Sequence, residues 1–206
     1  MNQEREVIFS RVRGALRPLT NRAPLPDFES ELVRMRRDLT VADLWPRFSE
    51  NLKAVNGQAL DDIAALGAFL KSKGWTHGYC DPHLLPLIAP SLGDGFNVET
   101  EFDRGRIDDY QFGFTRACGA IAETGTIIFD DRSTTKRLAA LAPWAHIAVF
   151  KRSEIYPDVP AAIAALGKDP NIVWATGPSK TADVEGILIE GVHGPGIQIG
   201  LLLETV

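Results

Sequence analysis

The sequence predicts a three-layer α/β/α domain with a mostly parallel sheet, preceded by N-terminal helices. From about residue 60 onward, short apolar runs alternate with helical patterns, and this alternation is typical of parallel sheets covered by helices on both faces. The chain has 206 residues, which is enough for one domain with a sizeable core. We place an accessory helical region at residues 1–55 and the α/β domain at residues 56–206.

The N-terminal region contains two helical patterns separated by prolines. Residues 3–17 carry Val7, Ile8, Val12 and Leu16 on one helix face. Residues 18–26 contain three prolines and are expected to form a linker. Residues 28–53 return to a helical period, with one apolar stripe ending at Leu39 and another that contains Phe48.

The α/β domain is predicted from alternating strand and helix patterns. Helices are expected at 60–72, 84–88, 136–141 and 159–166, and strands near 75–80, 96–102, 112–118, 126–129, 146–150, 171–176 and 197–203. Between the last two strands, Val184, Ile187, Leu188 and Val192 recur at helical spacing, and Thr181 is the expected N-cap. We therefore expect a short helix there.

Composition excludes several classes of protein. The formal net charge of −5 argues against a nucleic-acid-binding protein, because such binding depends on neutralising phosphates. Two cysteines cannot supply the four thiolates of a usual iron–sulfur cluster. The N-terminus lacks a signal-peptide pattern, and no apolar run approaches the ~20 residues of a membrane span, so we expect a cytoplasmic protein.

Three short motifs occur in the second half of the chain. They are Ala-Glu-Thr-Gly-Thr at residues 122–126, Gly-Pro-Ser-Lys-Thr-Ala-Asp-Val-Glu at residues 177–185, and Gly-Val-His-Gly-Pro at residues 191–195. Their combination and order resemble the signatures of the LUD-domain family. Two positions depart from the family pattern: Lys180 stands where arginine is usual, and Val184 where isoleucine is usual.

The resemblance implies both a fold and a function. LUD domains are similar to the superfamily of ribose-5-phosphate isomerase, glucosamine-6-phosphate deaminase and the coenzyme A transferases. The family implies a part in oxidising L-lactate to pyruvate, with electrons carried by separate iron–sulfur subunits of a lactate-utilisation complex. We therefore expect no intrinsic cofactor and no metal in this chain, and we leave its oligomeric state open.

The motifs supply the candidate site residues. Glu123 and His193 are the catalytic candidates, because a carboxylate and an imidazole beside glycines can act as base, nucleophile or acid. A substrate carboxylate or phosphate is expected to bind the neighbouring polar and glycine residues, which are Thr124, Gly125, Thr126, Gly177, Pro178, Ser179, Lys180, Thr181, Asp183 and Gly194. We expect the corner at Glu123 and the loop at 177–181 to converge at one edge or end of the sheet.

Several alternatives stay open at this stage. Glu123 could instead pin its own corner, and Ser179 and Thr181 could simply cap a helix. The chain could be a self-sufficient isomerase or transferase acting on a phosphorylated or thioester substrate, or a non-catalytic ligand-binding subunit. His77, Cys80 and His83 have metal-like spacing, but no second cluster supports a metal site.

Overall fold

The structure is a computed structural model that describes residues 2–18, 24, 40–134, 136–166, 171–182 and 186–204. The chain divides into two units, residues 1–37 and residues 38–206. The first unit contains α1, Asn2–Leu16, which confirms the predicted N-terminal helix. The predicted linker at 18–26 and the helical stripe that ends at Leu39 fall almost entirely outside the described residues.

The second unit is built on a six-stranded parallel sheet. Its strand order is β1-β12-β7-β4-β2-β3. The strands span Gln58–Leu60 (β1), His77–Cys80 (β2), Asn97–Glu99 (β3), Phe112–Arg116 (β4), Ala145–Phe150 (β7) and Ile197–Leu202 (β12). Five of these strands were predicted. The strand β1 was not predicted, because Leu60 fits the apolar face of the helix that follows.

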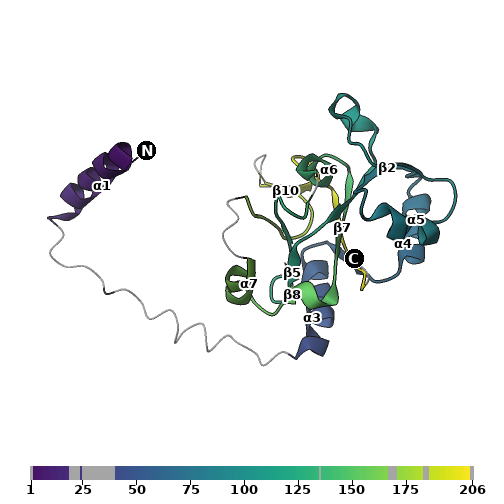
Figure 1. Cartoon of the computed structure of the whole chain (residues 1–206), viewed down its shortest axis with the longest axis horizontal. Coiled ribbons are helices and arrows are strands. Elements are labelled where there is room, and N and C mark those ends of the chain that lie inside the picture. Colours follow the sequence, from purple (N-terminus) through teal and green to yellow (C-terminus); the bar gives the residue numbers. More distant parts are fainter. Residues whose placement is uncertain are drawn as a thin grey trace. The chain divides into compact units, whose positions relative to one another are not determined.

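One face of this sheet is covered by two helices, α4 (Ile63–Ser72) and α5 (Leu85–Leu92), as Figure 1 shows. Alternate strand residues point to this face, since successive side chains in a strand lie on opposite sides. They pack with the helices into a buried cluster that includes Leu66, Ile88, Phe114, Ile147 and Leu201. This cluster is the larger of the two cores that flank the sheet.

The opposite face is covered by helices and by a second sheet. The helices are α3 (Val41–Ala54) and the short α6 (Arg137–Leu141). The second sheet has the order β8-β5-β6-β9, with spans Gly119–Ile121 (β5), Thr126–Phe129 (β6), Ile155–Tyr156 (β8) and Val173–Ala175 (β9). The helix α7, Val159–Leu166, packs on its outer side through Ala162. The predicted three-layer architecture with a mostly parallel sheet is thereby confirmed.

Two details of the sheet differ from the prediction. The run 112–118 was expected to be one strand, but β4 ends at Arg116, and a further strand, β5, begins at Gly119. At the end of β4, the Arg116 guanidinium donates to the carbonyls of Ala117 and Val149 and pairs with Glu154. The second difference is that β6 and β9 lie in the second sheet, where they pair antiparallel, instead of extending the parallel one.

The helix α3 is part of the α/β unit, although the sequence analysis placed it in the accessory region that ends at residue 55. Phe48 and Leu52 are completely buried in a core that also contains Phe150 and Leu202 from the main sheet. Helix α3 begins at a capping box, in which the Thr40 backbone N–H donates to the Asp43 carboxylate. Two short 3₁₀ segments, η1 (Arg104–Asp109) and η2 (Arg152–Glu154), complete the unit.

The prediction of a helix between β9 and β12 is wrong, because both ends of that segment are strands. Residues Lys180–Thr181 (β10) and Ile189–Glu190 (β11) form an antiparallel pair, with Lys180 opposite Glu190. Gly186 and Gly191 have positive φ, which suits turns and not a continuing helix. The apolar side chains of Ile187 and Leu188 are more than half exposed, so no helix face buries them. Residues 183–185, including Asp183, lie outside the described part of the chain.

Candidate functional site

The corner that contains Glu123 joins β5 to β6 and is held by α3. Gly125 has φ +66°, and a side chain there would collide with the backbone of Asn51 and Leu52. The Asn51 amide donates to the carbonyls of Ala122 and Glu123, at 2.7 and 2.8 Å. The backbone of the corner is therefore fixed from outside by one helix.

A chain of hydroxyl groups connects this corner to the next signature. Thr124 Oγ1 lies 2.6 Å from Thr126 Oγ1, which lies 2.7 Å from Thr176 Oγ1. In the same region, Ile127 of β6 pairs with Ala175 of β9. The expected convergence of the two corners is confirmed. The Glu123 side chain itself is exposed.

The loop at Gly177 rests on the same end of α3. Gly177 has φ +78°, and a side chain there would approach the Val55 carbonyl oxygen to 2.5 Å. Lys180 Nζ donates to that carbonyl at 2.7 Å and lies 3.6 Å from the Glu190 carboxylate. The Lys180 charge thus has partners within the fold, and Lys180 and Thr181 lie on a strand instead of at a helix start.

The two C-terminal signatures hold each other in place. The Ser179 N–H donates to the Pro195 carbonyl, and the Gly191 N–H donates to the Ser179 carbonyl, both at 2.9 Å. A side chain at Gly194 would contact the Ser179 side chain at 3.2 Å. The two loops are therefore packed side by side, and both face the cavity described next.

A cavity of about 280 Å³ lies between the main sheet and the second sheet, and we call it the interlayer cavity. Five of the residues predicted for the site line it: Gly177, Pro178, Ser179, His193 and Gly194. The other predicted residues within the described chain are absent from its lining; they are Glu123, Thr124, Gly125, Thr126, Lys180 and Thr181. The structure thus brings the second and third signatures to one cavity and leaves the first beside it.

Buried polar side chains of the main sheet form part of the cavity wall. His146 and Gln198 are the second residues of β7 and β12, and both line the cavity although they are only 1% and 3% exposed. Thr115 Oγ1 lies 2.8 Å from His146 Nε2, and the Gln198 amide lies within 3.2 Å of His146 Nδ1. Burial lowers the pKa of His146 to about 4, so the imidazole is neutral at pH 7.

Thr115, His146 and Gln198 were not predicted as site residues, although the sequence contains one signal for two of them. His146 and Gln198 each interrupt a strand that is otherwise apolar, Ala-His-Ile-Ala-Val-Phe and Ile-Gln-Ile-Gly-Leu-Leu. A polar residue inside a buried strand needs a hydrogen-bond partner, so two such residues indicate a buried polar cluster. Their pairing across β7 and β12 required the strand register, in which Gln198 lies opposite His146.

Arg137 supplies positive charge at the interlayer cavity. It is the first residue of α6, its side chain is half exposed, and its Nε lies 2.9 Å from an Asp131 carboxylate oxygen. Among the described residues that line this cavity, no other is lysine or arginine. The cavity therefore combines one cation with the Ser179 hydroxyl, the His193 imidazole and a neutral buried histidine.

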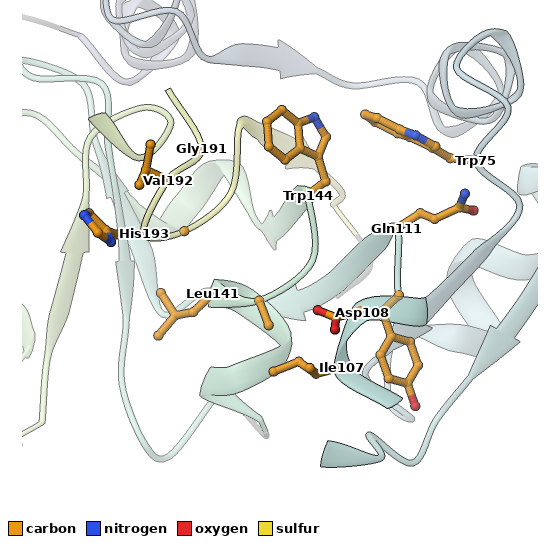
Figure 2. A pocket seen from close by; sticks show the side chains of 12 residues that line it. Trp75, Ile107, Asp108, Gln111, Leu141, Trp144, Gly191, Val192 and His193 are labelled. Carbon is orange, nitrogen blue, oxygen red and sulfur yellow. The ribbon is translucent and has the colours of Figure 1, made fainter. Parts of the chain in front are cut away.

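A second pocket adjoins the first, and Figure 2 shows it from close by. It has a volume of about 460 Å³ and shares Leu141, His193 and Gly194 with the interlayer cavity. We call it the tryptophan pocket, because Trp75 and Trp144 line it. His193 thus lies where the two cavities meet.

Two of the three residues with metal-like spacing, His77 and Cys80, have other partners. His77 Nε2 lies 3.0 Å from a Glu99 carboxylate oxygen, and the Cys80 thiol lies 3.4 Å from the Asp81 carbonyl. Burial raises the pKa of Cys80 to about 12, which favours the thiol over the thiolate that binds metals. Within the described ranges, no three His, Cys, Asp or Glu side chains are grouped to hold a metal ion. None of the described helices is long and apolar enough to cross a membrane.

Comparison with known proteins identifies relatives of this chain. Lactate utilization protein C of Deinococcus radiodurans is 34% identical over 168 residues, which cover 76% of this chain and 78% of that protein. Lactate utilization protein C of Shouchella clausii is 26% identical over 88% of this chain and 85% of its own length. The resemblance drawn from the three signatures is thereby confirmed.

A solved structure supports the fold. The crystal structure of a DUF162 family protein from Deinococcus radiodurans matches with a TM-score of 0.58 and 24% identity, covering 80% of this chain and 99% of that one. The family model of the LUD domain matches residues 84–203, which are more than half of the chain and include all three signatures. This chain belongs to the LUD domain family.

Proposed function

We propose that this chain is a subunit of a system that oxidises L-lactate to pyruvate together with separate iron–sulfur proteins. The observation that carries the proposal is its 34% identity, over three quarters of its length, to a protein named lactate utilization protein C. In this proposal, the interlayer cavity binds the small carboxylate.

The chemistry of the cavity suits such a ligand. A carboxylate prefers arginine, whose planar guanidinium can donate two parallel hydrogen bonds, and Arg137 lines the cavity. Ser179 offers a hydroxyl, and His193 an imidazole. Arg137 would exchange its exposed bond to Asp131 for one to the ligand. A volume of about 280 Å³ lies near the lower end of the range for small-molecule sites and has room for a small carboxylate.

The proposal places the iron–sulfur clusters on other subunits. A cluster with four thiolate ligands needs four cysteines, and this chain has two. Cys80 is buried and Cys118 is partly buried, and burial raises the pKa of both thiols to about 12. The electrons taken from lactate must then pass to a partner or to a small acceptor.

The alternative, a self-sufficient isomerase or transferase, needs Glu123 beside the reacting atoms. The Glu123 side chain is exposed, and it lines neither of the two cavities. Turnover of a phosphorylated or thioester substrate by the purified chain alone would favour this alternative. Binding of a small acid without turnover would favour the subunit proposal.

The first experiment is calorimetry of the full chain with L-lactate and with pyruvate. We expect binding that weakens roughly tenfold or more in Arg137→Ala, because a charge-assisted hydrogen bond is worth about 1.5–3 kcal/mol. Arg152→Ala is the matched control, since Arg152 also has an exposed ion pair, with Glu204 at 3.0 Å, but does not line the cavity. Equal affinities in the two variants would contradict the cavity assignment.

The second experiment tests the subunit role. A tagged chain is purified from cells grown on lactate, and the co-purifying proteins are analysed for iron and labile sulfide. We expect iron–sulfur proteins in the complex and slower growth on lactate after deletion. Their absence, with normal growth, would overturn the proposed function.

A further inference from the structure

The tryptophan pocket contains an exposed indole that is held in place by glycines. Trp144, which precedes β7, is 48% exposed. One part of its ring lies against the backbone of Gly191 and Gly196, where a side chain at Gly191 would come within 2.6 Å of the ring. Large apolar side chains are costly to leave in water, and a fixed exposed indole is a ready surface for stacking.

A second indole and two polar side chains line the same pocket. In Figure 2, Trp144 and Trp75 lie along one side of the pocket, and Ile107 and Asp108 approach from the other. Trp75 is partly buried and packs edge-to-face on Phe69, with 6.4 Å between ring centroids. A flat ligand on Trp144 would therefore have Asp108 within the same enclosure.

The Gln111 amide is oriented by the backbone. Its Oε1 accepts hydrogen bonds from the N–H groups of Thr76 and His77, at 2.8 and 3.0 Å. The amide carbonyl is thereby occupied, and the NH₂ group is the part of Gln111 left to donate to a ligand. The pocket thus offers one oriented amide donor besides its indoles.

The charge of this pocket is opposite to that of its neighbour. Among the described residues that line it, Asp108 is the only carboxylate, and none is lysine or arginine. The adjacent Arg106 is engaged elsewhere, because its guanidinium bonds to the Glu99 carboxylate at 2.5 Å. Indole faces carry negative electrostatic potential, so two indoles and a carboxylate together favour a cation.

We propose that the tryptophan pocket binds a small planar heteroaromatic cation, of the pyridinium type. Its ring stacks on Trp144, its positive charge is balanced by Asp108, and a carbonyl substituent accepts from the Gln111 amide. The volume of about 460 Å³ is in the range of small-molecule sites and exceeds what one arginine or lysine side chain of a partner would fill. This site is distinct from the interlayer cavity and does not depend on the function proposed for it.

The test uses two probes of nearly equal shape, the 1-methylnicotinamide cation and neutral nicotinamide. Binding to the full chain is measured by ligand-observed NMR and calorimetry. We expect the cation to bind roughly five- to thirtyfold more tightly, as about 1–2 kcal/mol of cation–π and ionic stabilisation implies. Trp144→Ala should weaken both probes roughly tenfold. Trp174→Ala, which removes an exposed indole that lines only the interlayer cavity, should weaken neither.

The variant Asp108→Asn removes the negative charge of the pocket with little change in the size of the side chain. Asp108 lies exposed on η1, so its replacement should leave the fold unchanged even if Trp144→Ala does not fold. We expect Asp108→Asn to lower the affinity for the cation several-fold, leaving only the part of its preference that the indoles supply, with no change for nicotinamide itself. Equal binding of the two probes by the wild type would overturn the proposal. So would tighter binding of N-acetylarginine amide, which would indicate a partner side chain as the occupant.

Discussion

Two glycine-containing corners carry family signatures, and the structure uses them differently. The corner at 122–126 is pinned by Asn51 and by close contact of Gly125 with α3, and its carboxylate is exposed. The loop at 177–179 also rests on α3, but its other side lines the interlayer cavity together with His193 and Gly194. The glycine-containing corner at 122–126 therefore attaches the second sheet to α3, whereas the loop at 177–179 also forms part of a cavity wall.

The difference arises from what each corner faces. Gly125 is enclosed by the backbone of a helix, so that no space is left for a ligand. Ser179 is instead opposed by Gly194, and the absence of a side chain there keeps the cavity open. A short motif with glycine beside a reactive residue is thus insufficient to locate a site, because the neighbouring element decides what the glycine accommodates.

The largest expected effect tests attachment at the first corner. Gly125→Ala should destabilise the α/β unit by about 4 kcal/mol, since it adds left-handed strain to a collision with the Leu52 backbone. This corresponds to a drop in Tm of roughly 8–16 °C. Gly74→Ala is the control, because Gly74 has a similar φ of +71° with open space around it, and it should cost only about 1 kcal/mol. Similar losses in the two variants would mean that the contact with α3 is unimportant.

The next largest effect is the loss of stability at acidic pH that the buried His146 in the cavity wall should cause. The pKa of His146 is about 4 in the folded state, below the ~6.5 of an unfolded chain. Between these pH values the unfolded state binds more protons, so the free energy of unfolding falls as pH drops from about 6.5 to about 4. The contribution is fully present above pH 6.5, and its loss amounts to about 3 kcal/mol.

Urea unfolding from pH 7.5 to 4.5 measures this effect. Relative to wild type, His146→Gln should show a shallower pH dependence, by up to about 1.4 kcal/mol per pH unit. The surface variant His83→Gln should follow the wild type, since His83 is exposed. Parallel curves for wild type and His146→Gln would contradict the assignment of a buried neutral imidazole.

The smallest expected effects distinguish residues that hold the first corner to α3 from residues that bind a ligand in the interlayer cavity. Asn51→Ala removes two hydrogen bonds to the first corner and should cost about 1–3 kcal/mol of stability, without changing the affinity for a small acid. Ser179→Ala should change stability by less than about 0.5 kcal/mol, yet weaken the acid several-fold. Denaturation and calorimetry on both variants test this contrast. An affinity loss confined to Asn51→Ala would reverse the roles of the two corners.

Much of the fold follows from local patterns in the sequence. The strands at 146–150 and 197–203 are apolar apart from His146 and Gln198, as expected for the interior of a parallel sheet, and the structure places them next to each other. The division into two sheets could not be predicted, because the residues of β6 and β9 would suit a strand of either sheet. What separates them is the pairing of Ile127 with Ala175, a long-range choice without a local signal.

The candidate site was harder to predict than the fold. The loops at 177–179 and 193–195 were identified through their signatures, whereas Arg137 and His146 belong to no motif. The apolar spacing at i, i+3 and i+4 after Thr181 also predicted a helix that the structure does not contain. The strands on either side pair instead, with Lys180 opposite Glu190. The spacing of apolar residues cannot distinguish a helix from a pair of strands here, because Ile187 and Leu188 stay exposed in the fold.

The position of β2 has a consequence for how the family match is interpreted. The segment that the family model matches begins at residue 84, after α3, β1, α4 and β2. Yet β2 is an interior strand that pairs with both β3 and β4, and α3 carries both signature corners. A chain cut to residues 84–203 would therefore leave β3, β4 and β12 each without one partner strand, and its two loops would lose their contacts with α3. The segment that the family model matches is therefore shorter than the compact unit, which begins at residue 38 and includes the capping box at Thr40.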